Sequence, residues 1–330
     1  MADEEKKNKS KVVNPHDKVF RETYSNKENA RSLLANNLPD RVLKLVDLDS
    51  LEISKDSFIE KDLADYYSDI LYQVMFKNGS QGFIYVLFEH KSYYDKFVHL
   101  QLLEYIVKIW RLYIKQHKKQ PDYLPIVIPL LVCHAGKEWS ENTEHLASLL
   151  SGPVDELAGY IPDFGFELYD LHRYSDDQIK GTIMSRVILQ LLKHIRDPDL
   201  RQKLPGILGL MRTLMGKETG LQWIEVVVRY QASALEDDEL SVKQIKEIAE
   251  EAISKETGEY VMTLAEKLRK EGEERGYRQA IELGITLKFP EDIETVMAEV
   301  NKIDDLDTLV EITKTIKTAQ DISEILALLK

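Results

Sequence analysis

Three charged side chains near one predicted β-hairpin have the types and spacing of a metal-dependent hydrolytic site. Asp69 stands near the start of one apolar run, and Glu89 and Lys91 end the next. Two carboxylates that share a site repel each other unless a cation lies between them, and hard oxygen ligands of this kind suit Mg²⁺. Such a metal polarises phosphate and lowers the pKa of a bound water, which a nearby lysine can orient. The three residues predict metal-assisted phosphodiester hydrolysis, although the same spacing also fits an ordinary salt bridge at a strand end.

The hairpin that must bring these residues together reads YYSDILYQVMF, then NGS, then QGFIYVLFEHKS. Both runs are rich in β-branched and aromatic residues, and the Asn–Gly pair is a strong turn signal. A loop formed by residues 78–80 pairs Lys77 with Gln81. Continued along the strands, this register pairs Asp69 with Glu89, with Cβ atoms ~5 Å apart. The alternation predicts one face with Ile70, Tyr72, Val74 and Phe76 against Ile84, Val86 and Phe88.

The segment QLLEYIVKIWRLYIKQHKK after the hairpin predicts a helix that adds Gln101 as a candidate catalytic residue and Tyr105 as an auxiliary one. Gln101 and Tyr105 are four residues apart and therefore share a helix face. Only a short loop separates Glu89 from this helix, so its start is expected close to the carboxylates. Residues 91–119 hold seven Lys or Arg against two acidic residues. This basic stretch fits either a solvated helix face or a set of DNA contacts, whose candidates are Lys96, Lys108, Arg111 and Lys115.

The remaining pattern predicts an α/β fold with a mixed sheet flanked by helices. The runs LPIVIPLLVCHA and FELYDL read as further strands, and Pro125 and Pro129 favour an edge position or irregular ends for the first of them. NPHDKVFRETYSNKENARSLLANNL predicts two helical pieces with Asn26 as an N-cap, whereas LPDRVLKLVDLDSLEI is ambiguous between helix and strand. Cys133, the single cysteine, lies in an apolar run and is expected to be a buried thiol.

Charge and composition divide the chain of 330 residues, whose formal net charge is -13. From residue 236 to the end there are 24 acidic and 13 basic residues, a net of -11. We therefore expect a disordered tail over 1–13, an α/β domain over 14–235 and an acidic all-helical region over 236–330. No apolar run approaches the ~20 residues of a membrane span, and the start lacks an apolar signal core, so the expected location is cytoplasmic. The negative charge argues against simple electrostatic binding of nucleic acid.

Several stretches together resemble the Rpn, or YhgA-like, family of recombination-promoting nucleases, which also carries the label transposase. They are HDKVFRETYS, SDILYQV, YVLFEHKS, the QLLEY helix and PIVIPLLVCHAGKEW. The resemblance covers roughly residues 14–235 and is strongest over 69–139. The family belongs to the PD-(D/E)XK nuclease superfamily, so the resemblance implies a restriction-endonuclease-like core and Mg²⁺-dependent cleavage of DNA. Cys133 departs from the family, in which a Tyr is common before the following His.

By position, the resemblance implies that Asp69 and Glu89 hold the metal and that Lys91 serves the attacking water. Asp17 or Glu22 in the first helix would be an auxiliary acid, and Gln101 would flank the site. The expected function is a metal-dependent DNA endonuclease linked to recombination or mobile elements, with the C-terminal helices able to form a homodimer. The alternative is a non-catalytic helical interaction protein on a degenerate nuclease fold.

Overall fold

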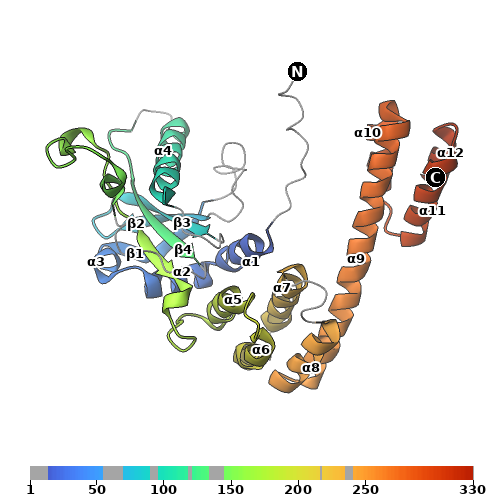
Figure 1. Cartoon of the computed structure of the whole chain (residues 1–330), viewed down its shortest axis with the longest axis horizontal. Coiled ribbons are helices and arrows are strands. Elements are labelled where there is room, and N and C mark those ends of the chain that lie inside the picture. The colour runs from blue at the N-terminus through green and yellow to red at the C-terminus, as the bar shows by residue number, and fades with distance from the viewer. Residues whose placement is uncertain are drawn as a thin grey trace. The chain divides into compact units, whose positions relative to one another are not determined.

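The computed structural model describes residues 14–54, 70–89, 96–117, 121–133, 145–215, 218–234 and 241–329, without the side chains of residues 89, 218 and 219. The chain divides into two compact units, Met1–Leu240 and Ser241–Lys330. The first unit combines a sheet with helices, and the described elements of the second are all helical (Figure 1). Within those ranges, no helix is both long and apolar enough to cross a membrane.

One mixed sheet organises the first unit, with its described strands in the order β1-β2-β3-β4-β5. These strands are β1 (Val46–Ile53), β2 (Ile70–Phe76), β3 (Gln81–Glu89), β4 (Ile126–Cys133) and β5 (Glu167–Asp170). Strands β1, β2 and β3 pair antiparallel, whereas β3, β4 and β5 pair in parallel. A parallel neighbour requires a crossover connection, and helix α4 (Val98–Gln116) supplies it between β3 and β4. The predicted α/β class is confirmed.

The β2–β3 hairpin is present, but its predicted register is wrong. Met75, not Lys77, pairs with Gln81. The cause is the turn, because Gly79 adopts a left-handed φ of 88° and its N–H donates to the carbonyl of Phe76 at 2.8 Å, which closes the loop one residue early. The pairing shifts by two residues, an even number, so the predicted faces are kept. The predicted Asp69–Glu89 pair rested on the wrong register, and Asp69 itself lies outside the described residues.

The prolines of β4 lie where a strand tolerates a residue without an N–H. β4 lies between β3 and β5 and is not an edge strand. However, β5 pairs only with its second half, from Leu130 onward. Pro125 precedes the strand, and Pro129 pairs with Tyr85 on the β3 side alone. Both prolines therefore occupy positions where one flank of β4 carries no strand, which is where a residue without an N–H is tolerated.

Helix α4 covers one face of the sheet with an apolar cluster. Tyr105 stacks on Tyr85 with ring centroids 4.9 Å apart, and Tyr113 meets Phe83 edge-on at 6.3 Å. Cys133 is fully buried in the same cluster, which confirms the expected buried thiol. The other buried members of the cluster are Leu71, Leu87, Val98, Leu102, Ile109 and Leu131.

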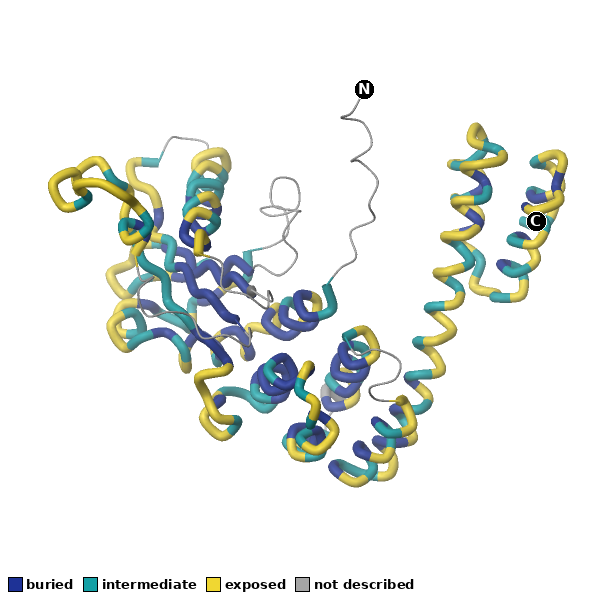
Figure 2. Tube along the Cα trace, in the orientation of Figure 1, coloured by how far each residue is buried: buried dark blue, intermediate teal, exposed yellow. Residues whose placement is uncertain are grey.

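The opposite face of the sheet packs against α1 (Pro15–Tyr24) (Figures 1 and 2). Phe20 stacks on Phe88 with centroids 4.3 Å apart and rings 11° from parallel. The hydroxyl of Tyr72 donates to the backbone carbonyl of Tyr24 at 2.7 Å, and the Tyr24 hydroxyl lies 2.8 Å from Ser185 Oγ. Burial raises the pKa of the hydroxyls of both tyrosines well above its ordinary value. These hydroxyls stay protonated and serve the packing of α1.

The segment after α1 resolves the ambiguous stretch of the sequence. Helix α2 (Lys27–Asn37) begins after Asn26, whose side chain accepts hydrogen bonds from the next turn, as predicted for an N-cap. The ambiguous run divides into a single turn of helix, α3 (Asp40–Leu43), and strand β1. The described part of the first unit also contains the α-helices α5 (Ile183–His194), α6 (Leu200–Gly209) and α7 (Glu218–Ala234).

A charged network centred on His194 ties α5 to the chain on both sides of it. His194 Nε2 lies 2.8 Å from Asp176 Oδ1, and its Nδ1 lies 2.6 Å from Asp197 Oδ2. Both ring nitrogens can donate only when the imidazole is protonated. Lys193 donates to Asp176 at 2.7 Å and Lys203 donates to Asp197 at 2.6 Å. Burial opposes the ionisation of both carboxyls, but these hydrogen bonds outweigh it and lower the pKa of Asp176 and of Asp197.

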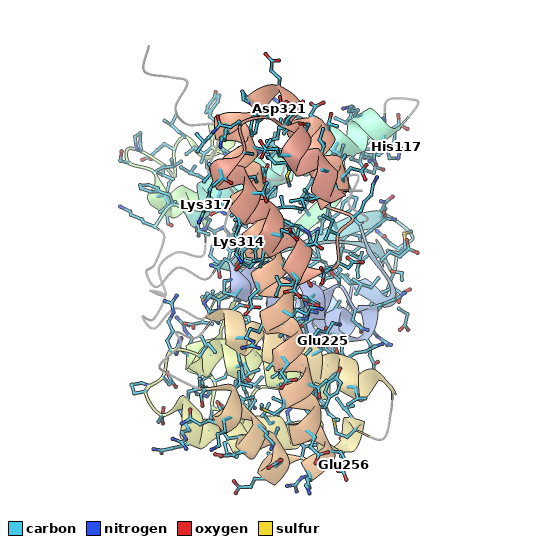
Figure 3. The ribbon with its side chains drawn as sticks, turned by 90° about the vertical axis from the view of Figure 1, so that its right-hand side faces the viewer. His117, Glu225, Glu256, Lys314, Lys317 and Asp321 are labelled. Carbon is cyan, nitrogen blue, oxygen red and sulfur yellow. The ribbon has the colours of Figure 1, made fainter. Side chains whose placement is uncertain are left out.

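The second unit is built on the long helix α9 (Lys255–Lys288). Helix α8 (Val242–Ala252), which starts with a capping box at Ser241, packs on its first part. The last part of α9 shares a second apolar cluster with α10 (Ile293–Val300), α11 (Leu306–Thr318) and α12 (Ser323–Leu326). Lys314, Lys317 and Asp321 lie on the surface of this unit (Figure 3).

We predict that Asp176→Asn lowers the free energy of unfolding by ~1–2 kcal/mol near pH 7, because His194 and Lys193 lose a charged acceptor that solvent partly screens at 40% exposure. The pKa of Asp176 is lowered in the folded chain, so this contribution is present above the unfolded pKa of ~3.9 and is lost as pH falls through the folded pKa. Urea unfolding of both proteins at pH 7 and pH 3 measures this, and the difference should shrink at pH 3. Asp49→Asn, which breaks the exposed pair with Arg31, is the control and should cost under ~1 kcal/mol. Equal losses at both pH values would contradict the assignment.

Candidate active site

The predicted site residues are placed by the carboxyl end of β3, where the described part of the chain reaches Glu89. Glu89 is the last residue of β3, and its Cα pairs with Cys133 at the end of β4. Ile70, the residue after Asp69, opens β2 opposite Val86. Asp69, Lys91 and the side chain of Glu89 lie outside the described residues. Their roles therefore remain predictions, and the described neighbours decide what else stands at this strand end.

Helix α4 brings Gln101 and Tyr105 to the β3 end on one face. The pairs Tyr85–Tyr105 and Phe83–Tyr113 show that α4 runs opposite to β3. Tyr105 is buried, so it packs under the site and is not free to approach a substrate. Gln101 lies one helical turn, ~6 Å, further toward the carboxyl end of β3 and is half-buried. Of the two predicted residues, Tyr105 therefore packs in the core, whereas Gln101 can reach the strand end.

Helix α1 brings Asp17 to the same strand end from the opposite face. Asp17, Phe20 and Tyr24 follow one another at helical spacing and are all buried. Phe20 stacks on Phe88, the residue before Glu89. Asp17 precedes Phe20 by three residues, so it lies one turn from that stack on the same face of α1. A carboxylate with only 7% exposure thus sits beside the end of β3.

Glu22, the alternative auxiliary acid, lies on a different side of α1. Residues 17 and 22 are five apart, which separates their directions by ~140° around a helix. Glu22 is exposed and lines a cleft together with residues of α7, including Glu225. The sequence alone could not choose between the two acids, and the packing of α1 favours Asp17 as the one beside β3.

The four candidate DNA contacts lie on or beside α4. Lys108, Arg111 and Lys115 are spaced three and four residues apart and share one side of the helix. Lys108 pairs with Glu104 at 2.8 Å, and Lys96 stands just before the helix with its ammonium 5.7 Å from the Phe97 ring centre. From the level of Gln101 to Lys115 the helix rises ~21 Å. Lys108, Arg111 and Lys115 therefore form a basic strip along the second half of α4, and Lys96 stands before its first turn.

Asp170, at the end of β5, is a carboxylate that the sequence analysis missed. Its Cα pairs with Cys133, which pairs in turn with Glu89, so the three residues lie in one row across the sheet. Asp170 is 1% exposed; its Oδ1 accepts from the N–H of His172, and its Oδ2 is 3.4 Å from Nε of Arg173. The parallel order of β3, β4 and β5 could have pointed to it, but the sequence does not reveal that order.

The described carboxylates near this edge could offer oxygen ligands to a metal ion. In the ranges given above, no three or more His, Cys, Asp and Glu side chains are grouped so that they could hold a metal. The described carboxylates near the ends of the parallel strands are those of Asp17 and Asp170, and the sulfur of Cys133 is enclosed in the apolar cluster. Carboxylate oxygens match the preference of Mg²⁺, and the described imidazole nearby, that of His99, is buried in the first turn of α4 against Phe166. A divalent cation at this edge stays a prediction, because its expected ligands, Asp69 and the side chain of Glu89, lie outside the described residues.

Comparison with known proteins gives a consistent set of relatives. Residues 14–222 match the family model described as "Putative transposase, YhgA-like". The chain is 32% identical over 273 residues, 82% of its length and 87% of the relative's, to the inactive recombination-promoting nuclease-like protein RpnE of Escherichia coli (strain K12). It is 29% identical over 266 residues, 81% of its length and 87% of the relative's, to the recombination-promoting nuclease RpnA of the same strain. No solved structure matches the chain.

We predict that Asp17→Asn lowers the rate of DNA cleavage ~10- to 100-fold, the usual effect of removing a group that supports metal ligands. The amide keeps the size of the carboxylate, so the melting temperature should change little. A plasmid-nicking assay and thermal unfolding measure the two quantities. The control is Glu28→Gln, which changes an exposed acid in the first turn of α2. If Asp17→Asn cleaves at the parent rate, Asp17 is only a buried residue of the core.

Proposed function

The chain belongs to the YhgA-like family, and on that premise we propose that it is a metal-dependent DNA endonuclease whose active site lies at the carboxyl end of β3. One observation carries the proposal: α1 and α4, on opposite faces of the sheet, both deliver polar side chains to that strand end. The names of the relatives support a nuclease-like activity linked to recombination. We further propose that the mixed sheet and its flanking helices form a restriction-endonuclease-like core.

In this proposal Asp69 and Glu89 hold a divalent cation, for which Mg²⁺ is the best chemical match. When bound, the cation would polarise the scissile phosphate and lower the pKa of a coordinated water. Lys91 would orient that water, and Gln101 would contact the phosphate beside it. Asp17 would steady the cation from the α1 side. Tyr105 would have no chemical role, because its ring is buried against Tyr85.

The basic strip of α4 would bind the phosphates of the DNA backbone next to the cleavage site. Along one strand of B-DNA the phosphates repeat every ~3.4 Å, so the ~21 Å rise from Gln101 to Lys115 would follow several of them. Each contact would be electrostatic and sequence-independent. The strip also answers the objection raised by the net charge of -13, since binding depends on local charge along the DNA path.

A second function is favoured by one specific observation: the relative that is 32% identical is named inactive. In that case the chain would be a non-catalytic interaction protein on the same fold. The two functions differ in one measurable property, since only the nuclease nicks DNA in the presence of a divalent cation.

We predict that Glu89→Gln abolishes Mg²⁺-dependent nicking of supercoiled plasmid and leaves the fold intact, because a metal ligand is lost while side-chain size is kept. Lys91→Ala should lower turnover ~10²- to 10⁴-fold, in the range of general acid–base groups, with little change in metal affinity. Nicking rates over a Mg²⁺ titration separate these effects. A Glu89→Gln protein that nicks at the parent rate would exclude this site, and a parent chain that never nicks would favour the interaction protein.

We predict that Arg111→Ala weakens DNA binding and reduces the slope of log affinity against log salt by ~1, the loss of one phosphate contact. Its matched control is Arg201→Ala on α6, because α4 and α6 lie at different sides of the first unit (Figure 1). Fluorescence anisotropy with a labelled duplex at several salt concentrations, in a Glu89→Gln background to prevent cleavage, gives both quantities. Equal slopes for the two variants would mean that the DNA does not follow α4.

A further inference from the structure

A cleft of about 490 Å³ lies between α1 and α7, on the side of α1 that faces away from the proposed cleavage site. The two helices are joined beside it, because His16 Nδ1 lies 2.8 Å from the hydroxyl of Tyr230. A cleft of this size falls within the ~300–1,000 Å³ of small-molecule sites. Its lining consists of Lys18 and Glu22 from α1 and Gln222, Trp223, Glu225, Val226 and Arg229 from α7.

The lining combines one aromatic surface with charges of both signs. Trp223 is half-buried, so part of its ring can contact a ligand. Glu225 is engaged by Arg229, whose Nε and Nη2 donate to the same carboxylate oxygen at 2.9 and 2.6 Å. Lys18 and Glu22 are exposed, and neither forms an ion pair with another residue of the described ranges. One cation and one anion are therefore available on α1, facing an indole on α7.

The indole, the ammonium and the carboxylate in this cleft match the base, the phosphate and the hydroxyl groups of a nucleotide. A planar heterocyclic base stacks favourably on indole, as bases stack on aromatic side chains in nucleic-acid complexes. An ammonium such as that of Lys18 attracts phosphate as a point charge. A carboxylate such as that of Glu22 accepts hydrogen bonds from hydroxyl or amino groups. A purely anionic ligand would be repelled by Glu22, and an apolar ligand would leave both charges desolvated.

We propose that the α1–α7 cleft is a nucleotide-binding site, in which the base stacks on Trp223, the phosphate lies against Lys18 and Glu22 accepts from sugar hydroxyls. The site is separate from the cleavage chemistry and needs no metal. The nucleotide comes either from a free mononucleotide or from an unpaired strand end. The proposal goes beyond the proposed endonuclease activity, because binding here can be present in a chain that does not cleave DNA.

The test is a fluorescence and calorimetric titration of the full chain in the absence of metal, with AMP, adenosine and a 5′-phosphorylated single-stranded dodecamer as probes. AMP should quench tryptophan emission, and Trp223→Ala should weaken AMP binding about tenfold or more through loss of stacking. Trp110→Phe is the matched control, because its indole donates to the carbonyl of Pro125 outside the cleft. That variant should bind AMP as the parent does.

Two further variants assign the polar contacts. Lys18→Ala should weaken binding of AMP about tenfold and leave adenosine unchanged, since only AMP carries the phosphate. Glu22→Gln should weaken binding of AMP more than that of its deoxy analogue, which lacks one hydroxyl. Tighter binding of the dodecamer than of AMP would identify a strand end as the source, and the reverse would identify a free nucleotide.

The proposal is overturned if neither AMP nor the dodecamer binds at millimolar concentration, or if Trp223→Ala binds AMP as the parent does while its melting temperature is unchanged. If Trp223→Ala does not fold, Lys18→Ala decides alone, because an exposed lysine can be removed without disturbing the core. Loss of nicking in Glu89→Gln with AMP binding intact would show that the two sites are independent. The nucleotide-site proposal is thus tested by AMP titration, and the nuclease proposal is tested separately by plasmid nicking.

Discussion

The parallel pairing of β3 with β4 is the constraint on which the rest of the first unit depends. A parallel neighbour cannot follow through a tight turn, so the chain must leave the carboxyl end of β3, cross over as α4 and return to the amino end of β4. The stack of Tyr105 on Tyr85 is consistent with this path, in which α4 runs back along β3 with its first turns at the strand end. Gln101 is placed near Glu89 by this crossover, and the carboxyl edge of the parallel strands becomes a natural ligand site.

Helix α1 directs its two candidate acids, Asp17 and Glu22, to different sides of the helix. The stack of Phe20 on Phe88 fixes its rotation. Once that rotation is fixed, the buried carboxylate of Asp17 must lie on the sheet side, and Glu22 must face α7. The two acids looked equivalent in sequence because each is a lone carboxylate in the same amphipathic helix. Their difference arises only from packing.

Much of the fold could be predicted from local pattern, and the failures have specific physical causes. Strands β2 to β5, the crossover helix and the Asn26 cap were predictable because turn chemistry, alternation and capping act over a few residues, whereas the segment that forms β1 was ambiguous. The hairpin register was missed because one left-handed glycine, Gly79, decides where the loop closes. The place of β4 between two strands was missed because Pro129 suggests an edge, whereas β5 leaves that half of β4 uncovered. Asp170 was missed because strand order is not written in local sequence.

The central claim is that a divalent cation binds at the carboxyl end of β3, and a crystal of the full chain soaked with Mn²⁺ would test it most directly. The account predicts one anomalous scattering peak within coordination distance of the carboxylates of Asp69 and Glu89, in a coordination sphere of oxygen atoms, at ~2.0–2.3 Å. The same peak should be absent from crystals of Glu89→Ala. A peak at another place in an actively cleaving protein, or cleavage that persists without any peak at this strand end, would contradict the account.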